Sequence, residues 1–153
     1  TIVHYQSQED LDAFDKAIKY SPLSSSSGLK WLFSDSGKER SLEKLKDKMD
    51  ALYGRAQEIL GMRKRQEKKV RINVYHDTEQ LKQAFHDIYK QKCRFRAWYV
   101  FETNTIYVTT ADLHEGMLAH EMAHSIIDHY LTVRPPSASA EILARYVDSH
   151  LHE

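Results

Sequence analysis

The chain has 153 residues, of which 41% are apolar and 29% charged, and its 22 basic and 22 acidic residues leave a formal net charge of zero. This balance is typical of one soluble domain and argues against a nucleic-acid partner or an anionic membrane surface. No apolar run approaches the roughly 18 residues that a membrane-spanning helix needs. Cys93 is the single cysteine, so no intrachain disulfide is expected. The first residue, Thr1, is not a methionine, and a removed signal peptide is one explanation; export is slightly favoured over a cytoplasmic location.

The first segment is predicted to contain a short strand, a helix and a loop. Residues 2–5 are expected to form the strand, and Ser7 with Asp10 makes a capping box for the helix that follows. The apolar residues of that helix are Leu11, Phe14 and Ile18. The serine-rich residues 21–28 predict a flexible loop. The apolar residues 31–33 are then expected to anchor in the core.

A long amphipathic helix is predicted over residues 38–61, with Ser36 and Glu39 as its capping pair. Its apolar residues alternate at spacings of three and four: Leu42, Leu45, Met49, Leu52, Ala56 and Ile59. One such stripe indicates a helix packed along its whole length, here as the backing of a sheet. A coiled-coil arm is the alternative interpretation. Gly61 and the basic run 63–65 are suited to end the helix.

The middle of the chain is predicted to alternate strands with one helix. Residues 70–75 alternate as a strand, with Val70, Ile72 and Val74 on one side. Asp77 or Thr78 begins a helix. Its apolar residues are Leu81, Phe85, Ile88 and Tyr89. Residues 94–101 and 105–108 are expected to pair as a hairpin around 102–104.

Two further helices are predicted, over residues 112–131 and 141–151. Thr109 with Asp112 is a plausible capping box for the first helix, and Ser137 or Ser139 could cap the second. Pro135 and Pro136 separate the two helices. The order of elements predicts an α+β fold over residues 1–153, in which a small mixed sheet is backed by helices. Residues 1–37 would form an N-terminal part of this single domain, and residues 38–151 its core.

The most informative motif is His120-Glu121-Met122-Ala123-His124. Residues four apart lie on one face of a helix, so His120 and His124 can bind one metal ion, and Glu121 can take a proton from water beside it. This H-E-x-x-H pattern is typical of zinc metallopeptidases, although an accidental match is the alternative in a chain with nine histidines.

A hydrolytic zinc site needs a third protein ligand. The glycine and histidine that a metzincin would have are replaced by Ile127 and Tyr130. His114 and His129 lie off the helix face, and Asp128 lies a full turn beyond His124. Glu141, which sixteen residues separate from His124, lies in a second helix and is the best candidate if the chain turns back after the two prolines; an ordinary solvated glutamate is the alternative.

The motif 120–124, followed by Glu141-x-x-Ala144 on a second helix, resembles the gluzincin metallopeptidases. Residues 96–108 resemble the edge and return strands that precede the active-site helix in that family. The resemblance covers about residues 40–151 and is closest to the compact members called minigluzincins. It implies a zincin-like fold, Zn²⁺ as the cofactor and endopeptidase activity on peptide or protein substrates. Where thermolysin-like members have an aspartate, four residues after the ligand glutamate, this chain has Arg145.

The resemblance also implies roles for single residues. His120, His124 and Glu141 would be the zinc ligands, and Glu121 the general base and acid. A peptide substrate would bind as an added strand along the edge near Arg96, Ala97 and Trp98.

Other site residues are suggested by the chemistry rather than by the family. Hydrolysis of this kind usually needs a second donor to stabilise the oxyanion. Tyr146 is our first candidate for that donor, with Tyr130 and His150 as alternatives. Asp148, seven residues after Glu141, shares its helix face and is a candidate to orient a ligand; an ion pair with Arg145 is the ordinary alternative.

Two alternatives to an active zinc metallopeptidase remain open. The first is an interaction domain of the same fold with weak or absent catalysis. The second is a latent protease, inhibited by Cys93 at the open metal position or by the 21–28 loop with Trp31. The oligomeric state is not determined by the sequence.

Overall fold

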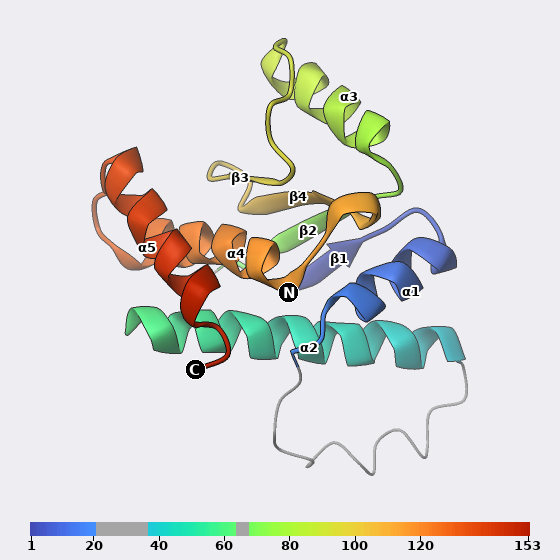
Figure 1. Cartoon of the computed structure of the whole chain (residues 1–153), viewed down its shortest axis with the longest axis horizontal. Helices are drawn as coiled ribbons and strands as arrows, with labels where there is room; N and C mark the ends of the chain where they lie inside the picture. Colours follow the sequence, from blue (N-terminus) through green and yellow to red (C-terminus); the bar gives the residue numbers. More distant parts are fainter. Residues whose placement is uncertain (21–36, 64–67) are drawn as a thin grey trace.

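The computed structural model describes residues 1–20, 37–63 and 68–153, where four strands form one mixed sheet and five α-helices surround it (Figure 1). The strands, in their order across the sheet, are β1 (Ile2–His4), β2 (Arg71–Tyr75), β4 (Thr105–Thr109) and β3 (Trp98–Val100). β1, β2 and β4 run parallel, and β3 pairs antiparallel with β4. The predicted α+β fold with a small mixed sheet is confirmed, and β3 is an edge strand of that sheet.

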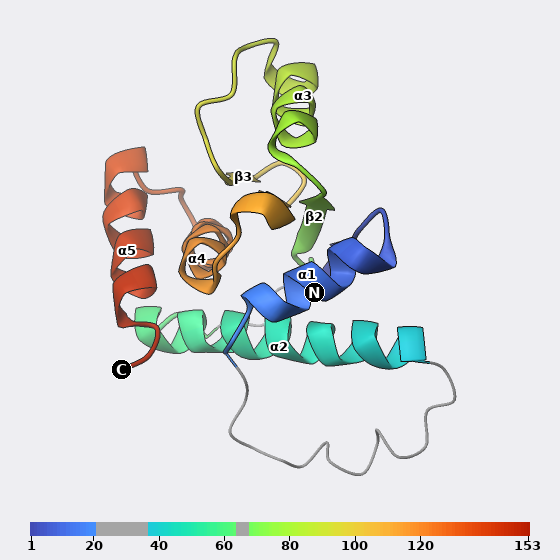
Figure 2. The ribbon, with the colours of Figure 1, turned by 45° about the vertical axis from the view of Figure 1, so that its right-hand side comes forward.

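The helices cover both faces of the sheet. They are α1 (Gln8–Ala17), α2 (Gly37–Leu60), α3 (Thr78–Tyr89), α4 (Glu115–Tyr130) and α5 (Ser137–His150). Figures 1 and 2 show α2 running along the base of the molecule, α3 standing on the opposite side of the sheet, and α5 lying beside α4. A short 3-10 turn, η3 (Thr110–Asp112), connects β4 to α4. No helix in the described ranges is long and apolar enough to cross a membrane.

The main core lies between the sheet and helices α1, α2, α4 and α5. Alternate strand residues point into it, among them Val3, Ile72, Val74, Ile106 and Val108. The central stripe of α2 is fully buried there: Leu45, Met49, Leu52 and Ala56. Leu42 and Ile59, at the two ends of the stripe, pack against the same core. The apolar stripe is therefore covered by other parts of the same chain, as expected for a helix that backs the sheet. The coiled-coil alternative is wrong.

A smaller aromatic core lies on the opposite face of the sheet, under α3. Its buried members are Leu81, Phe85, Cys93 and Trp98, with Tyr75 and Tyr107 packed against them. The rings of Trp98 and Tyr107 stack with their centroids 4.7 Å apart. Ile88 and Tyr89, at the end of α3, are 44% and 40% exposed, so only part of the predicted apolar face of that helix is buried.

Several predicted helix ends are confirmed. The Asp10 N–H donates to Ser7 Oγ over 3.2 Å at the start of α1, and the Gln80 N–H donates to Asp77 Oδ1 over 2.8 Å at the start of α3. Gly61 follows α2 with a φ of 65°, a conformation that glycine adopts without strain. The predictions for Ser36 with Glu39, for loop 21–28, for residues 31–33 and for most of the basic run 63–65 lie outside what the structure describes.

Two predicted helix starts are wrong. The Thr109 side chain accepts from the Ala111 N–H and so caps η3 rather than α4. The Asp112 carboxylate pairs with Arg96, and α4 begins only at Glu115. His114 caps α4 instead, because its Nδ1 accepts from the Met117 N–H over 3.2 Å.

The start of α5 also differs from its prediction. This helix begins at Ser137, directly after Pro136, with no side-chain cap from Ser137 or Ser139. The Pro136 carbonyl accepts from the N–H groups of Ser139 and Ala140, which starts the first turn through the backbone. Glu141 therefore lies in the second turn of α5 rather than at its start.

The hairpin of β3 and β4 is confirmed, but its first strand is shorter than predicted. Only Trp98–Val100 pair with β4, and residues 94–97 form a connection from α3. Asn104 lies in the turn between β3 and β4 and has a φ of 47°. Its side-chain oxygen accepts a hydrogen bond from Ser125 Oγ over 2.6 Å. Both of these residues are buried. This buried hydrogen bond ties the hairpin to α4 and so sets β3 beside that helix.

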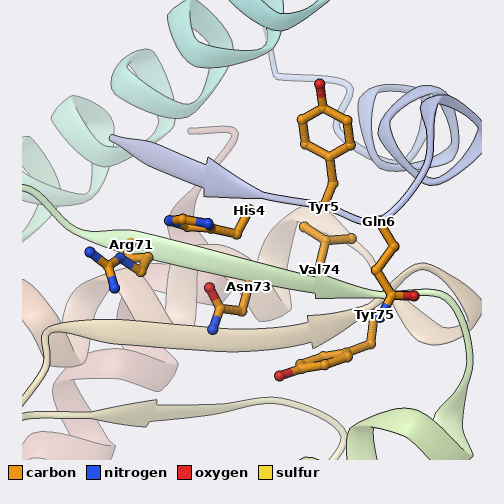
Figure 3. Close-up of a pocket in the computed structure, with 7 residues that line it drawn as sticks. All are labelled: His4, Tyr5, Gln6, Arg71, Asn73, Val74 and Tyr75. Atoms are coloured by element: carbon orange, nitrogen blue, oxygen red, sulfur yellow. The ribbon is translucent and has the colours of Figure 1, made fainter.

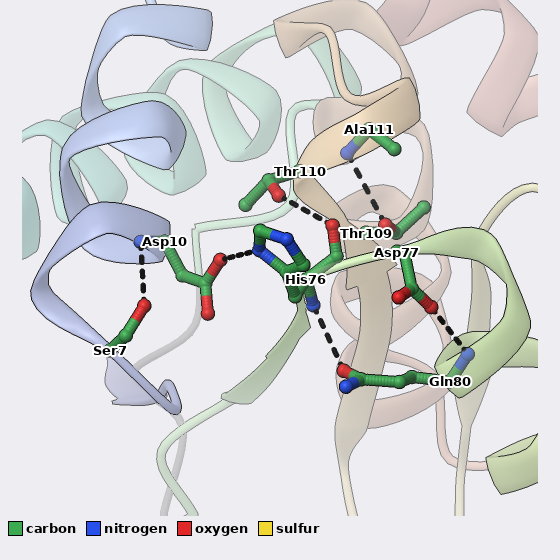
Figure 4. Close-up of polar contacts among 8 residues, drawn as sticks. All are labelled: Ser7, Asp10, His76, Asp77, Gln80, Thr109, Thr110 and Ala111. Carbon is green, nitrogen blue, oxygen red and sulfur yellow. Dashed lines mark hydrogen bonds and ion pairs between the residues drawn. The ribbon is translucent and has the colours of Figure 1, made fainter.

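A polar junction joins α1 to the loop that leads from β2 to α3 (Figure 4). The buried carboxylate of Asp10 accepts from His76 Nδ1 over 2.6 Å, and the His76 carbonyl accepts from Thr110 Oγ1 over 3.1 Å. The hydrogen bond from His76 to Asp10, together with the negative charge of Asp10, raises the pKa of His76 above its ordinary value. Glu9 and Asp77 raise this pKa further.

This junction predicts a pH dependence of stability. The pair stabilises the fold fully below about pH 6.5, where His76 is protonated in both states, and its contribution is lost as pH rises through the raised pKa of the folded state. We expect the unfolding free energy of the wild type, relative to His76→Gln, to fall between pH 6 and pH 9 in urea titrations. His86→Gln, which removes an exposed histidine from α3, is the control. A constant difference between wild type and His76→Gln across that range would contradict the prediction.

Candidate metal centre

Helices α4 and α5 position the three residues predicted to bind metal. His120 and His124 lie one turn apart on α4, where most neighbouring side chains are buried against the core. Glu141 lies on the adjacent α5, which is packed against α4 through Ala140, Ala144 and the other buried residues of its inner face. The turn at Pro135 and Pro136 brings α5 back along α4, as the placement of Glu141 requires.

The side chains of these three residues converge. Glu141 Oε1 lies 3.3 Å from His120 Nε2, and Glu141 Oε2 lies 3.2 Å from His124 Nε2. One ligand atom from each residue falls within 4.8 Å of the others. The two imidazole rings are 5.1 Å apart at their centroids, and the Nε2 atom of each faces the same Glu141 carboxylate. Two imidazoles and one carboxylate are the donor set of many catalytic zinc sites, so the residues present fit a zinc ion.

The charges around this group are consistent with metal binding. Burial and the neighbouring His120 lower the pKa of His124, which favours the neutral imidazole that a metal requires. Burial alone would raise the pKa of Glu141, but His120 and His124 outweigh it and the net pKa is lowered. Arg145 Nε also donates to Glu141 Oε1 over 3.2 Å. Arg145, which was noted from the sequence at the position where thermolysin-like proteins have an aspartate, thus contacts the Glu141 carboxylate itself.

Glu121 follows the first histidine and borders the same cleft. Burial, with a further contribution from the negative charge of Glu141, raises the pKa of Glu121 to about 8. A half-buried carboxyl group with a pKa this close to neutrality is suited to general acid–base chemistry.

The group opens into a cleft of about 710 Å³. Its lining on the α4 and α5 side includes His120, Glu121, His124, Asp128, Arg134 and Glu141. Its lining on the α3 and β3 side is formed by Phe85, Tyr89, Phe95, Ala97, Trp98 and Tyr99. This size is ordinary for a small-molecule or peptide site.

The structure brings some of the other predicted site residues to the cleft and leaves others away from it. Ala97 and Trp98 line the cleft. Arg96 does not, because its guanidinium pairs with Asp112 of η3. Asp148 is a residue of α5 whose carboxylate lies against the start of α4. It is so close to Gly116 that a Cβ added to Gly116 would lie 2.1 Å from Asp148 Oδ1.

None of the three candidate oxyanion donors is among the lining residues of the cleft. Tyr146 is 49% exposed and stacks on His150 with ring centroids 3.9 Å apart. Tyr130, at the end of α4, is 39% exposed. Tyr146 lies five residues after Glu141, which turns it to another face of α5.

The alternative ligands weighed from the sequence have other partners. His114 caps α4, and His129 Nδ1 donates to the Ser125 carbonyl over 2.9 Å. Asp128 accepts from Arg134 over 3.1 Å. Only His120, His124 and Glu141 come together as a possible metal group among the described residues.

Sequence reasoning missed Tyr99, Arg134 and the aromatic residues from α3. Tyr99 lies on the edge strand, its hydroxyl oxygen is 3.4 Å from His129 Nδ1, and burial raises its pKa, so it stays protonated at neutral pH. The Arg134 guanidinium lies 4.1 Å from the centroid of the Phe101 ring while pairing with Asp128. The alternation of 98–101 could have placed Tyr99 on the face opposite Trp98, but no local pattern indicates that α3 reaches the same cleft.

Cys93 lies away from the metal group. It is buried in the core under α3, and its Sγ donates to the Phe95 carbonyl over 3.2 Å. It is not among the lining residues of the cleft. The structure therefore gives no support to Cys93 as an inhibitory ligand, and the 21–28 loop with Trp31 lies outside the described residues.

A second, shallower cavity of about 240 Å³ lies against β1 and β2 (Figure 3). His4, Arg71, Asn73 and Tyr75 project from the strands around it, and none of its described lining residues carries a carboxylate. It offers neither a metal donor set nor a general base of the kind at the first cleft. Neither a family model, nor a curated protein, nor a solved structure matches the chain, so its function is inferred from the geometry of its own residues.

Proposed function

We propose that this protein is a zinc-dependent metallopeptidase that hydrolyses peptide bonds. The observation that carries the proposal is the convergence of His120, His124 and Glu141 within 4.8 Å, beside the half-buried carboxyl group of Glu121 and in an open cleft. Metal binding by itself does not require Glu121. Its place next to the first ligand favours hydrolysis over a purely structural metal site.

The proposed roles follow from the chemistry of each group. A zinc ion in this site supplies a Lewis acid that lowers the pKa of water towards about 7 and polarises a carbonyl oxygen. Glu121 accepts the proton from water at its carboxylate and later donates it to the nitrogen of the departing amine. His120, His124 and Glu141 hold the metal, and Arg145 holds Glu141 from the solvent side. We assign no oxyanion role to Tyr146, Tyr130 or His150, because the cleft lining does not include them.

Strand β3 supports a mode of substrate binding. It is one of the two edge strands of the described sheet, and its Trp98 and Tyr99 line the cleft. An extended peptide could pair its main chain with the outer edge of β3, as peptides do with exposed sheet edges. Such a peptide would pass between β3 and the metal group on α4. We propose Ala97 and Trp98 as substrate contacts and exclude Arg96, which pairs with Asp112.

Removal and return of the metal test the proposed function. We expect a chelator such as 1,10-phenanthroline to abolish cleavage of a peptide library by the purified protein, because the attacking water loses its Lewis acid. Zinc added after dialysis should restore cleavage, with about one zinc per chain measured by plasma mass spectrometry. Magnesium, which prefers oxygen ligands, is the control and should restore nothing.

Two results would contradict this proposal in different ways. If cleavage survives full metal removal, the cleavage would be due to a contaminating enzyme or to a different activity of the protein. Stoichiometric zinc without cleavage of any library member would favour an interaction domain that keeps the metal and lacks useful catalysis.

A further inference from the structure

The wall of the cleft that comes from α3 and β3 is aromatic. Phe85 stands at its centre, with the rings of Tyr89, Phe95 and Trp98 around it at centroid distances of 4.5, 5.9 and 5.1 Å. These residues come from α3, from the connection 90–97 and from β3. Figures 1 and 2 show α3 and this connection on the other side of β3 from α4 and α5.

The aromatic residues differ sharply in exposure. Phe85 and Trp98 are 7% and 6% exposed, whereas Tyr89 and Phe95 are 40% and 59% exposed. The inner pair therefore belongs to the core under α3, and the outer pair presents apolar surface to the cleft. Contiguous apolar surface in a concave site is a common mark of ligand binding.

Charge in the cleft is restricted to one side. The charged residues of its lining, Glu121, Asp128, Arg134 and Glu141, belong to α4, α5 and the loop between them. The lining from α3 and β3 contains no charged residue. A charged substrate side chain placed against that wall would lose hydration without gaining a partner, whereas an apolar one would bury surface on both sides.

We propose that this wall, defined by Phe85, Tyr89, Phe95 and Trp98, binds an aromatic or large aliphatic side chain of a peptide substrate, next to the bond at the metal group. The inference rests on the proposed function and adds its substrate class. A peptide paired with the edge of β3 projects alternate side chains to opposite sides, so one side chain in two would face the aromatic wall. Phe95 is the main contact, because it is the most exposed ring of the wall.

The experiment measures binding separately from cleavage. Zinc-loaded Glu121→Gln is titrated by calorimetry with a blocked peptide that carries phenylalanine at its centre, and with a matched peptide that has alanine there. We expect the phenylalanine peptide to bind about tenfold more tightly, a ratio typical of one aromatic side chain against an aromatic surface. Phe95→Ser in the same background should bring the two affinities to within about twofold.

Ile142→Ser is the matched control. Ile142 is a large apolar residue that is 69% exposed on α5 and does not line the cleft, so its loss should leave the tenfold preference unchanged. Because Phe95 is exposed, Phe95→Ser is expected to fold, and its melting temperature relative to Ile142→Ser checks this. Tyr89→Ser provides a second, independent change in the wall and should also weaken the preference.

The results separate this inference from the proposed function. Equal affinities for the two peptides, absence of binding for both, or a preference that survives both Phe95→Ser and Tyr89→Ser would overturn the aromatic wall as a binding surface. Cleavage of the two peptides by the wild type with equal efficiency would do the same while leaving the peptidase intact. A preference that disappears in Phe95→Ser, in a protein that cleaves neither peptide, would support the wall and overturn the peptidase.

Discussion

Glu141→Ala is expected to weaken zinc binding by more than about 100-fold, because it removes one of the three proposed ligands. Loss of a residue that only orients a ligand costs roughly 10–100-fold in metal affinity, and loss of a ligand itself costs more. The two histidines alone would keep a weak site, and the negative charge of Glu141 would no longer raise the pKa of His124. Competition with a chromophoric zinc chelator at fixed pH measures the affinity, and plasma mass spectrometry measures the metal retained after dialysis.

Asp148→Ala is the control on the same helix. Asp148 lies against Gly116 at the start of α4, and it is not among the residues that converge at the metal group. We expect its removal to change zinc affinity by less than about threefold, well below the 10–100-fold of a residue that orients a ligand. A large loss of zinc affinity in Asp148→Ala would restore the sequence-based prediction that Asp148 orients a ligand. Unchanged zinc affinity in Glu141→Ala would exclude Glu141 as the third ligand.

Glu121→Gln is expected to retain zinc and to lose peptide hydrolysis by a factor of about 10²–10⁴, the usual contribution of one general acid–base group. Glutamine has nearly the same shape but cannot accept the proton from water or return it to the amine. The loss should appear in kcat at saturating peptide, with zinc content equal to that of the wild type. The measurement is the initial rate of peptide cleavage together with metal content for each preparation.

Tyr146→Phe is the companion variant for that experiment. Its hydroxyl group lies outside the cleft lining, so we expect a kcat within about twofold of the wild type, compared with the 10²–10³ that loss of an oxyanion donor costs. A large loss of kcat in Tyr146→Phe would show that Tyr146 reaches the reacting atoms in a conformation other than the one described. A Glu121→Gln protein with wild-type activity would contradict the proposed mechanism directly.

Local patterns in the sequence predicted the elements well wherever one face of an element is buried. The spacing of Leu45, Met49 and Leu52 places one stripe of α2 in the core, and the alternation of Ile72 and Val74 does the same for β2. These predictions succeed because the periods of 3.6 and 2 residues are properties of the backbone itself. The start of α4 was predicted wrongly because Asp112, the expected capping partner of Thr109, pairs with Arg96 instead. The start of α5 was predicted wrongly because the Pro136 carbonyl, rather than a serine side chain, accepts from the first turn.

The residues of the candidate site likewise divide into those that local spacing predicted and those that it did not. His120 and His124 share one helix face by local geometry alone, and Glu121 must then lie beside the first of them. The choice of Glu141 needed an assumption about how the chain returns after Pro135 and Pro136, and the approach of Glu141 to both imidazoles agrees with that assumption. The same helical reasoning did not predict where Asp148 and Tyr146 lie, because it cannot say which of several α5 faces meets α4.

By itself, the sequence determined the H-E-x-x-H motif, the α+β class and the apolar face of each main element, because all of these depend on residues within a few turns of one another. Only the tertiary structure decided which distant residues border the motif. The aromatic wall joins α3 to β3 across the connection 90–97, and the Glu141 carboxylate meets His120 and His124 only because α5 is folded against α4. Packing between elements depends on the fit of whole side-chain surfaces, and no spacing within one element encodes that fit.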